Sequence, residues 1–178
     1  MNWNARLYLY INKLSGRYHW LDLFSRAGAE WAIFGLAAWF GLDLYFVFSP
    51  NRKTIFFGAI LFGAMWGLGM LISVLIGLVV KEPRPYLKHP EARLMFHPLS
   101  TWKSFPSDHA FAAFLFYFIG LVFGLPNMWA FLVLALWVGW GRVYAGVHYP
   151  FDIVGGASLA GLMAVLAYYL LVVVGLSF

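Results

Sequence analysis

The stretch Gly141-Arg-Val-Tyr-Ala-Gly-Val-His-Tyr-Pro-Phe-Asp152 indicates how the rest of this chain is organised. It places Arg142, His148 and Asp152 within one short piece of a very apolar sequence. Ionisable side chains are costly in or beside a membrane, so where they occur they usually serve a function. We therefore predict that these three residues belong to one functional site.

Composition indicates the class of protein. Of the 178 residues, 63% are hydrophobic and 11% are charged, which lies far outside the balance of a soluble globular domain. We expect a single integral-membrane domain over residues 1–178, folded as an all-α polytopic membrane helical bundle. The formal net charge is +5 without any nucleic-acid-binding motif. The expected partners are therefore the lipid bilayer and an anionic lipid phosphate, and no nucleic acid.

Five apolar runs are predicted to span the membrane as helices. The second run contains Gly63 and Gly67, whose spacing predicts a close-packing face. Cysteine is absent, which excludes disulfides, thiolate catalysis and cysteine-bound metals. The runs cover residues 27–48, 54–80, 109–124, 128–141 and 152–174.

Residues 1–25 precede the first run and are predicted to form an amphipathic helix at the membrane interface. Apolar residues recur there at helical spacing, while Arg6, Lys13 and Arg17 fall on the opposite side. Ser15-Gly16 is the position at which this helix would divide in two. The alternative is a short additional span packed against the bundle.

Two further polar stretches lie at the edges of long hydrophobic runs, Lys81-Glu-Pro-Arg-Pro85 and Ser104-Phe-Pro-Ser-Asp-His109. Both begin within residues 81–106, a long polar segment of the kind that often carries function, and we expect it to be an active-site loop. Counting the crossings of the five spans places this loop on the same side of the membrane as residues 141–152. We therefore predict that all three stretches meet at one phosphate.

Arg84 and Arg142 are the candidate phosphate-binding cations, because guanidinium forks match phosphate oxygens bidentately. Two such cations on one side of the membrane indicate a dianionic ligand. Ser107 is expected to be the N-cap of the third span, whose free backbone amides would point at the same pocket.

His148 and Asp152 are expected to work as a pair. They are four residues apart, so the carboxylate can hold one imidazole nitrogen about one helical turn away. That arrangement orients a nucleophilic histidine, and His109 from the third span is the candidate general acid. These residues predict a phosphatase that uses a covalent phosphohistidine and needs no metal or other cofactor. Metal-assisted hydrolysis is the alternative chemistry, although no spacing such as His-Glu-x-x-His is present.

A non-catalytic lipid-binding or transport protein is the alternative of a different class. It would carry polar groups along the middle of its spans rather than at one end, and Asp43 is weak support for it. Several other ionisable residues are assigned no chemistry: His19, His89, His97, Glu30 and Asp43.

At these residues the chain resembles the type-2 phosphatidic acid phosphatase superfamily, the integral-membrane lipid phosphatases related to vanadium haloperoxidases. The pattern of that family is Lys-x6-Arg-Pro, then Pro-Ser-Gly-His, then Ser-Arg-x5-His-x3-Asp. Here the second motif stands as Pro106-Ser-Asp-His109, and the third runs from Gly141 to Asp152 with the same spacing. The resemblance covers Gly77 to the carboxyl terminus. It implies His148 as nucleophile, Asp152 as its partner and His109 as acid, with Arg84, Ser107 and Arg142 around the phosphate.

The chain departs from that pattern at three positions. The family lysine falls at Gly77, whereas the available lysine is Lys81, which joins the candidate phosphate-binding residues. Gly141 replaces the serine before the arginine. Asp108, also a candidate, replaces glycine, and its carboxylate would repel phosphate unless it is protonated or paired. The possible partners of Asp108 are Lys81, Lys88 and Lys103.

The form Pro-Ser-Asp-His is similar to that of the bacterial bacitracin-resistance subgroup, which removes a phosphate from undecaprenyl pyrophosphate. The resemblance thus implies undecaprenyl pyrophosphate as substrate, with phosphatidylglycerol phosphate or phosphatidic acid as alternatives. It also implies a bacterial cytoplasmic membrane and an active site that faces outward. The distribution of Lys and Arg indicates the opposite orientation, because ten of the twelve lie on the side of the site.

Overall fold

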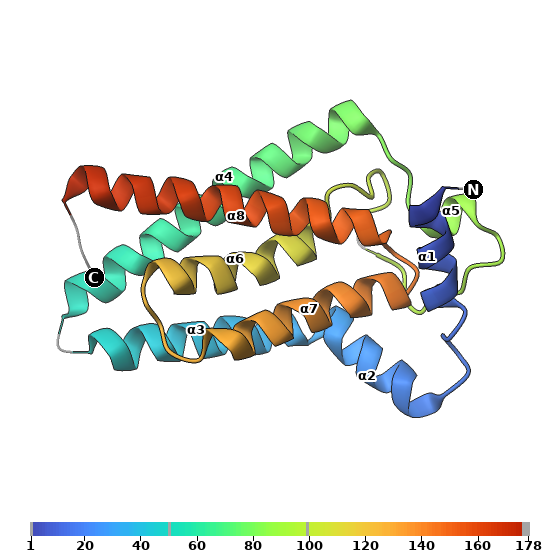
Figure 1. Ribbon diagram of the computed structural model, residues 1–178, viewed down its shortest axis with the longest axis horizontal. Helices are drawn as coiled ribbons and strands as arrows, with labels where there is room; N and C mark the ends of the chain where they lie inside the picture. The colour runs from blue at the N-terminus through green and yellow to red at the C-terminus, as the bar shows by residue number, and fades with distance from the viewer. Residues whose placement is uncertain (1, 50, 99, 176–178) are drawn as a thin grey trace.

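The computed structural model describes residues 2–49, 51–98 and 100–175, and their regular structure is helical, as predicted. The long helices run side by side along one axis, and the short helices α1 and α5 lie at one end of this bundle (Figure 1). The helices are α1 (Trp3–Asn12), α2 (His19–Glu30), α3 (Ala32–Phe48), α4 (Arg52–Val80), α5 (Pro85–Lys88), α6 (Asp108–Val122), α7 (Met128–Tyr144) and α8 (Pro150–Val174).

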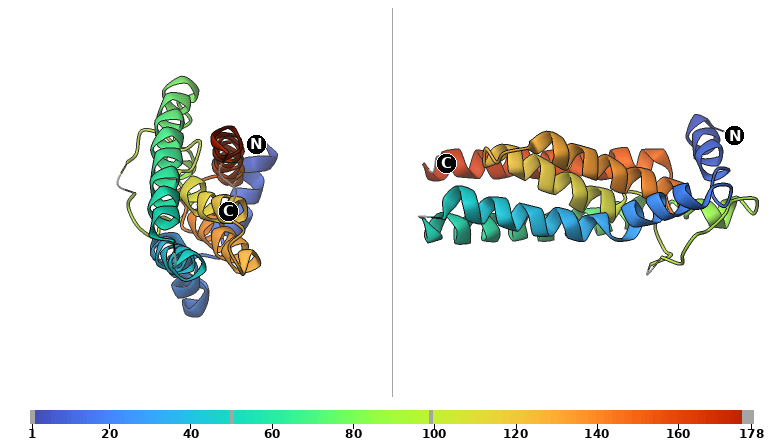
Figure 2. Two further views of the ribbon diagram at one scale, coloured as in Figure 1. Left: turned by 90° about the vertical axis from the view of Figure 1, so that its left-hand side faces the viewer. Right: turned by 90° about the horizontal axis from the view of Figure 1, so that it is seen from below.

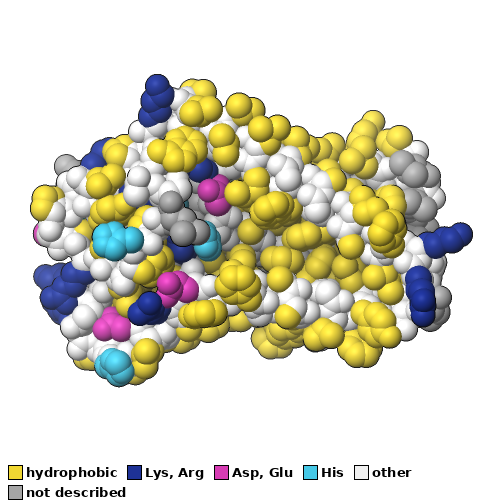
Figure 3. Space-filling view, turned by 180° about the vertical axis from the view of Figure 1, so that it is seen from behind, with side chains coloured by type: hydrophobic (Ala, Val, Ile, Leu, Met, Phe, Trp, Pro, Cys, Tyr) yellow, Lys and Arg dark blue, Asp and Glu magenta, His cyan; other side chains and the backbone are white. Residues whose placement is uncertain are grey.

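Four of the five predicted apolar runs each coincide with one helix, whereas the run 27–48 covers the end of α2 and all of α3. Helices α4 and α8 are long and apolar enough to cross a membrane, and α2 with α3 passes the same test as one span bent by 52°. Helices α6 and α7 are apolar but shorter, with 15 and 17 residues. Hydrophobic side chains cover most of the elongated body, and Lys and Arg lie toward its two ends (Figure 3). This distribution is that of an integral membrane protein.

Helix α6 forms the centre of the bundle. It lies between α4 and α7 in the end-on view (Figure 2), and it packs closely against both α7 and α8. Phe111, Leu115 and Ile119 are each 0% exposed. Because α6 is enclosed by other helices, it can be shorter than a lipid-facing span while its amino-terminal end reaches the candidate site.

The amino-terminal segment forms two helices rather than one. Helix α1 ends at Asn12 and α2 begins at His19, with Gly16 at a φ of 71° in between, so the break lies where Ser15-Gly16 indicated. Tyr8 and Asn12 are buried against the rest of the protein. The expected boundary near residue 25 falls inside α2, because α2 packs along α7 up to its bend at Trp31. The location of residues 1–25 at the membrane interface stays a prediction.

The prediction that α4 packs closely against other helices through Gly63 and Gly67 is wrong. A Cβ atom added at Gly63 or Gly67 would meet nothing within 4 Å. The bundle instead contacts a different side of α4, on which buried residues recur every four positions. These residues are Leu61, Met65, Gly69, Ser73 and Gly77.

Gly141 is a point of close helix contact. A Cβ atom there would lie 2.5 Å from both the Ser25 carbonyl oxygen and the Ala29 amide nitrogen of α2. Backbone atoms cannot move aside as a flexible side chain can, so α2 leaves no room for a side chain at this position. The approach of α2 therefore explains why glycine stands where the family pattern has serine.

We expect Gly141→Ala to lower the free energy of unfolding by about 1–3 kcal/mol through overpacking. Gly63→Ala is the matched control, since its methyl group meets open space and alanine favours a helix by about 1 kcal/mol over glycine. Thermal unfolding of both variants in one detergent checks the prediction. Equal midpoints for the two variants would contradict the close contact between α2 and α7.

Candidate active site

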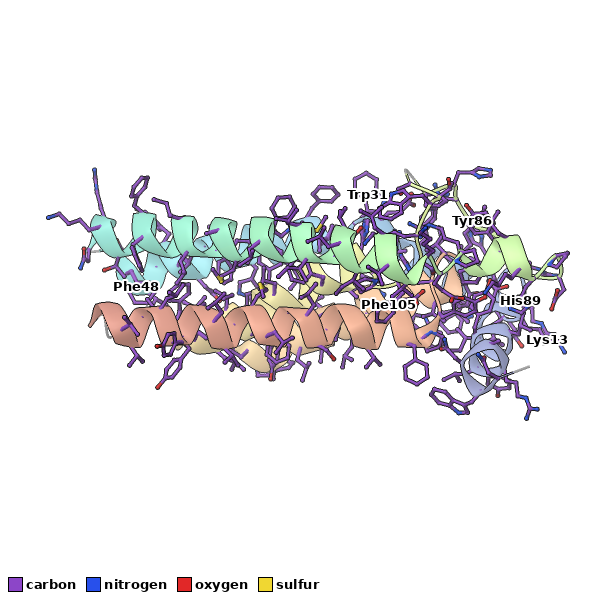
Figure 4. The ribbon with its side chains drawn as sticks, turned by 90° about the horizontal axis from the view of Figure 1, so that it is seen from above. Lys13, Trp31, Phe48, Tyr86, His89 and Phe105 are labelled. Carbon is purple, nitrogen blue, oxygen red and sulfur yellow. The ribbon has the colours of Figure 1, made fainter. Side chains whose placement is uncertain are left out.

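The three polar stretches meet at one end of the bundle, as predicted. Polar side chains gather near Tyr86 and Phe105, at the end opposite Phe48 (Figure 4). Arg84 donates through Nη1 to the carbonyl oxygen of Val147 at 3.0 Å, which joins the 81–106 loop to the stretch after α7. The counting of membrane crossings thus placed these segments correctly.

His148 is contacted at both ring nitrogens. Its Nδ1 lies 3.3 Å from Asp152 Oδ2, and its Nε2 lies 3.2 Å from Arg84 Nη1. A guanidinium can only donate hydrogen bonds, so Nε2 is the acceptor and Nδ1 carries the ring proton. The imidazole is therefore neutral, with the Nε2 lone pair on the side of the arginine. This tautomer is the one that attack by Nε2 requires.

The surroundings of His148 favour this neutral form. The residue lies in the connection between α7 and α8 and is 3% exposed. Burial, followed by the positive charges of Arg142 and Arg84, holds the pKa of His148 well below its usual value of 6.5. The imidazole consequently stays unprotonated as the pH falls through 6.5.

Asp152 is fixed by a set of hydrogen bonds. Its Oδ2 accepts from the Ser104 hydroxyl at 2.5 Å and from the Tyr149 amide at 2.8 Å, in addition to facing His148. The Ser104 amide in turn donates to the Glu82 carbonyl oxygen at 2.8 Å. The carboxylate that orients His148 is thus itself held by the 81–106 loop.

Arg84 and Arg142 each keep hydrogen-bonding capacity for a ligand. Both are buried, and within the described residues neither Nε atom has a hydrogen-bond partner. Arg142 donates through Nη1 to the Ala29 carbonyl oxygen at 3.3 Å, and its guanidinium carbon lies 5.4 Å from the centre of the Phe96 ring. An unpaired buried N–H is costly, so two of them beside His148 suit a phosphate anion.

The amino-terminal end of α6 completes the surroundings of His148. Ser107 is the N-cap, as predicted, and its hydroxyl oxygen accepts from the Ala110 amide at 3.4 Å. Its own amide donates to the Asp152 carbonyl oxygen at 3.0 Å. His109 follows in the first turn, half-buried and within electrostatic range of Arg142 and His148. A histidine in that place is suited to proton transfer on a leaving oxygen.

Asp108 is paired with Lys103, which settles the choice that the sequence left open. The Lys103 Nζ lies 2.6 Å from Asp108 Oδ1. Lys88 pairs instead with Glu82, at 2.9 Å. Lys81 is exposed and ends α4 in a left-handed conformation with a φ of 51°.

Comparison with known proteins identifies the family of the chain. The family model "PAP2 superfamily" matches residues 57–174, which is more than half of the chain. This chain belongs to the PAP2 superfamily. It is an integral-membrane lipid phosphatase.

Two curated relatives of this PAP2 protein come from Bacillus. A protein of Bacillus licheniformis named bacitracin transport permease protein BcrC is 31% identical over 93% of this chain and 79% of its own length. The undecaprenyl-diphosphatase BcrC of Bacillus subtilis is 30% identical over 88% of this chain and 78% of its own length. Among solved structures, LpxE of Aquifex aeolicus has a TM-score of 0.71 at 24% identity, over 95% of this chain and 96% of the other. The last likeness shows the shared fold.

Two residues of this PAP2 site were missed by the sequence reasoning. Ser104 contacts Asp152, and Ser73 of α4 donates to Asp108 Oδ1 at 2.6 Å. A serine in an irregular loop or among apolar helical residues carries no periodic signal. Its role becomes visible only when its partner is placed in space.

We expect nitrogen NMR of histidine-labelled protein to show the His148 imidazole neutral at pH 6. In Arg142→Gln the midpoint of its titration should move to higher pH, because one positive charge near the ring is removed. A variant lacking His148 assigns the signal. An imidazole that is already protonated at pH 6.5 in the unaltered protein would contradict the neutral tautomer.

Proposed function

We propose that this PAP2 phosphatase hydrolyses undecaprenyl pyrophosphate to undecaprenyl phosphate through a phosphohistidine on His148. The observation that carries the proposal is the Nε2 atom of His148, a neutral acceptor 3.2 Å from the Arg84 guanidinium with Arg142 nearby. A phosphate bound by the two arginines would present its phosphorus to that lone pair.

The proposed reaction has two steps. In the first, Nε2 of His148 bonds to the terminal phosphorus while the bond to the bridging oxygen breaks, and His109 gives a proton to that oxygen. Asp152 holds the Nδ1 proton and stabilises the positive charge that develops on the ring. In the second step, water attacks the phosphohistidine, His109 accepts a proton from the water, and inorganic phosphate leaves. The two arginines stabilise the charge on the phosphoryl oxygens in both steps.

The choice of lipid rests on the relatives and on the site. The Bacillus subtilis relative is named an undecaprenyl-diphosphatase. The site lies at one end of a body that exposes many large hydrophobic side chains (Figure 3), which suits a phosphate attached to a long apolar tail. Phosphatidylglycerol phosphate and phosphatidic acid are the alternative substrates, since the contacts around His148 recognise a phosphoryl group that all these lipids share.

Transport is the second candidate function, because the name of the Bacillus licheniformis relative mentions it. A transporter is expected to place polar groups near the middle of its spans. Asp43 has one carboxylate oxygen buried, but it lies five residues before the end of α3 at Phe48 rather than at the middle of the span. The gathering of Arg84, Arg142 and His148 at one end favours catalysis over transport.

We expect His148→Ala to reduce phosphate release by about a thousandfold or more, because the nucleophile is lost. Purified protein in detergent would be assayed with undecaprenyl pyrophosphate, phosphatidylglycerol phosphate and phosphatidic acid. Substrate labelled at its terminal phosphorus should leave acid-labile label on the unaltered protein and none on His148→Ala. His97→Ala is the control, since His97 is exposed.

Two results would overturn the proposal. Release that persists in His148→Ala would exclude this nucleophile. Activity that a chelator abolishes and a single divalent ion restores would favour metal-assisted hydrolysis. No His, Asp and Glu group of three or more that suits a metal occurs in residues 2–49, 51–98 and 100–175, and the chelator experiment tests the alternative directly.

We further propose that the protein lies in a bacterial cytoplasmic membrane with its site facing outward. The count of Lys and Arg points the other way, but Arg84, Arg142 and Lys103 are buried in or beside the site rather than placed to set orientation. An anionic substrate also needs cations on the face that it approaches.

Single-cysteine variants test the orientation, because the chain contains no cysteine of its own. Glu91 lies at the same end of the bundle as the site, and its side chain is 59% exposed. Ser49 lies at the other end, in the turn between α3 and α4. The two variants are Glu91→Cys and Ser49→Cys. With a membrane-impermeant maleimide, we expect intact cells to label Glu91→Cys and only opened cells to label Ser49→Cys. The reverse pattern would place the site on the cytoplasmic side.

A further inference from the structure

Lys103 is a buried cation that the proposed reaction does not use. Its side chain is 4% exposed. Its Nζ donates to three oxygens: Asp108 Oδ1 at 2.6 Å, Ser73 Oγ at 2.6 Å and the Pro106 carbonyl at 3.2 Å. A buried ammonium is tolerated only when it is paired and hydrogen-bonded in this way. Lys103 is therefore held in one place, next to the first residue of α6.

The route of the Lys103 side chain crosses α4 at Gly77. A Cβ atom added at Gly77 would lie 2.5 Å from Lys103 Cδ and 3.0 Å from the Trp102 ring. The Lys103 chain thus fills the space that a side chain at position 77 would need. Gly77 lies seven residues before Arg84, which is the position of the lysine in the pattern Lys-x6-Arg-Pro.

Asp108 is a negative charge beside a site for an anion. Its charge acts on Arg84, Arg142 and His148. Its side chain is 33% exposed, while that of Lys103 is 4% exposed. Without a cation beside it, this carboxylate would repel a phosphate bound between the two arginines.

We propose that Lys103 is a positioning residue for the phosphate site. Lys103 neutralises Asp108. From the loop, and across Gly77, it also supplies the positive charge that the family pattern places on a lysine of α4. The inference rests on the phosphate site of the proposed function. It explains two departures from the pattern together, because aspartate at 108 and glycine at 77 both depend on a lysine at 103.

A double-mutant cycle tests whether Lys103 acts by neutralising Asp108. It compares Lys103→Met, Asp108→Asn and the double variant with the unaltered protein. Lys103→Met should raise KM about 10- to 100-fold with a smaller effect on kcat, because the bared carboxylate opposes binding of an anion. The double variant should return KM to within a few-fold of the unaltered protein, and Asp108→Asn alone should lower KM, because the positive charge of Lys103 is then unopposed beside the anion site. Inhibition by inorganic phosphate should follow the same order, which gives a second measure of anion binding.

Two outcomes of this cycle overturn the proposal. A double variant as poor as Lys103→Met would mean that Lys103 does not act through Asp108. A Lys103→Met variant with a lower unfolding midpoint and an unchanged KM would mean that the pair is purely structural. An unaltered protein that hydrolyses none of the substrates would instead contradict the proposed function. Failure of the proposed function is thus distinguishable from failure of the proposed role of Lys103.

Moving the lysine gives an independent test that does not depend on Lys103→Met folding. In Gly77→Lys combined with Lys103→Ala, the exposed Trp102 ring shifts slightly, and the new side chain occupies the space that Lys103 leaves and carries its ammonium toward Ser73 and Asp108. We expect this protein to fold and to keep KM within a few-fold of the unaltered protein, while Gly77→Lys alone clashes with Lys103. A relocated lysine that leaves KM as high as in Lys103→Ala would overturn the proposal.

Discussion

One carboxylate oxygen, Oδ2 of Asp152, joins the parts of the chain on which the site depends. It faces the imidazole of His148 and accepts from the Ser104 hydroxyl and the Tyr149 amide. These donors come from the active-site loop and from the connection between α7 and α8. Asp152 is 2% exposed, and a buried charge that lost its partners would be strongly destabilising. The orientation of His148 and the closure of the loop are thus two results of one set of hydrogen bonds.

The position of this set relative to the bundle follows from α6. Because α6 is enclosed, its amino-terminal end can lie beside His148 while the longer helices α4 and α8 extend further along the axis. The N-cap Ser107 is tied to the Asp152 backbone. The start of α6, His148 and the loop are therefore positioned by the same few contacts.

Much of this arrangement was predictable from the sequence, because it depends on spacing and on the parity of membrane crossings. The interval between His148 and Asp152 predicts their pairing, and five apolar runs bring the polar stretches to one side. The partner of Asp108 was not predictable, since three lysines lie in a loop without periodicity. The packing side of α4 was predicted wrongly at Gly63 and Gly67, because glycines at helical spacing occur on lipid-facing sides as well as packed ones. The reason for glycine at position 141 was not predictable either. The helix α2 that contacts it is distant in sequence, and only the folded structure shows that α2 leaves no room for a side chain there.

The bend between α2 and α3 has a mechanical consequence. A helix that stops leaves its last carbonyl groups without intrahelical partners, and that of Ala29, in the last turn of α2, accepts from Arg142. The bend of 52° between the two helices is therefore linked through one hydrogen bond to a guanidinium near His148. The end of α2 at this bend thus supplies an acceptor for Arg142, so the place where the first span is broken helps to fix a guanidinium of the candidate site.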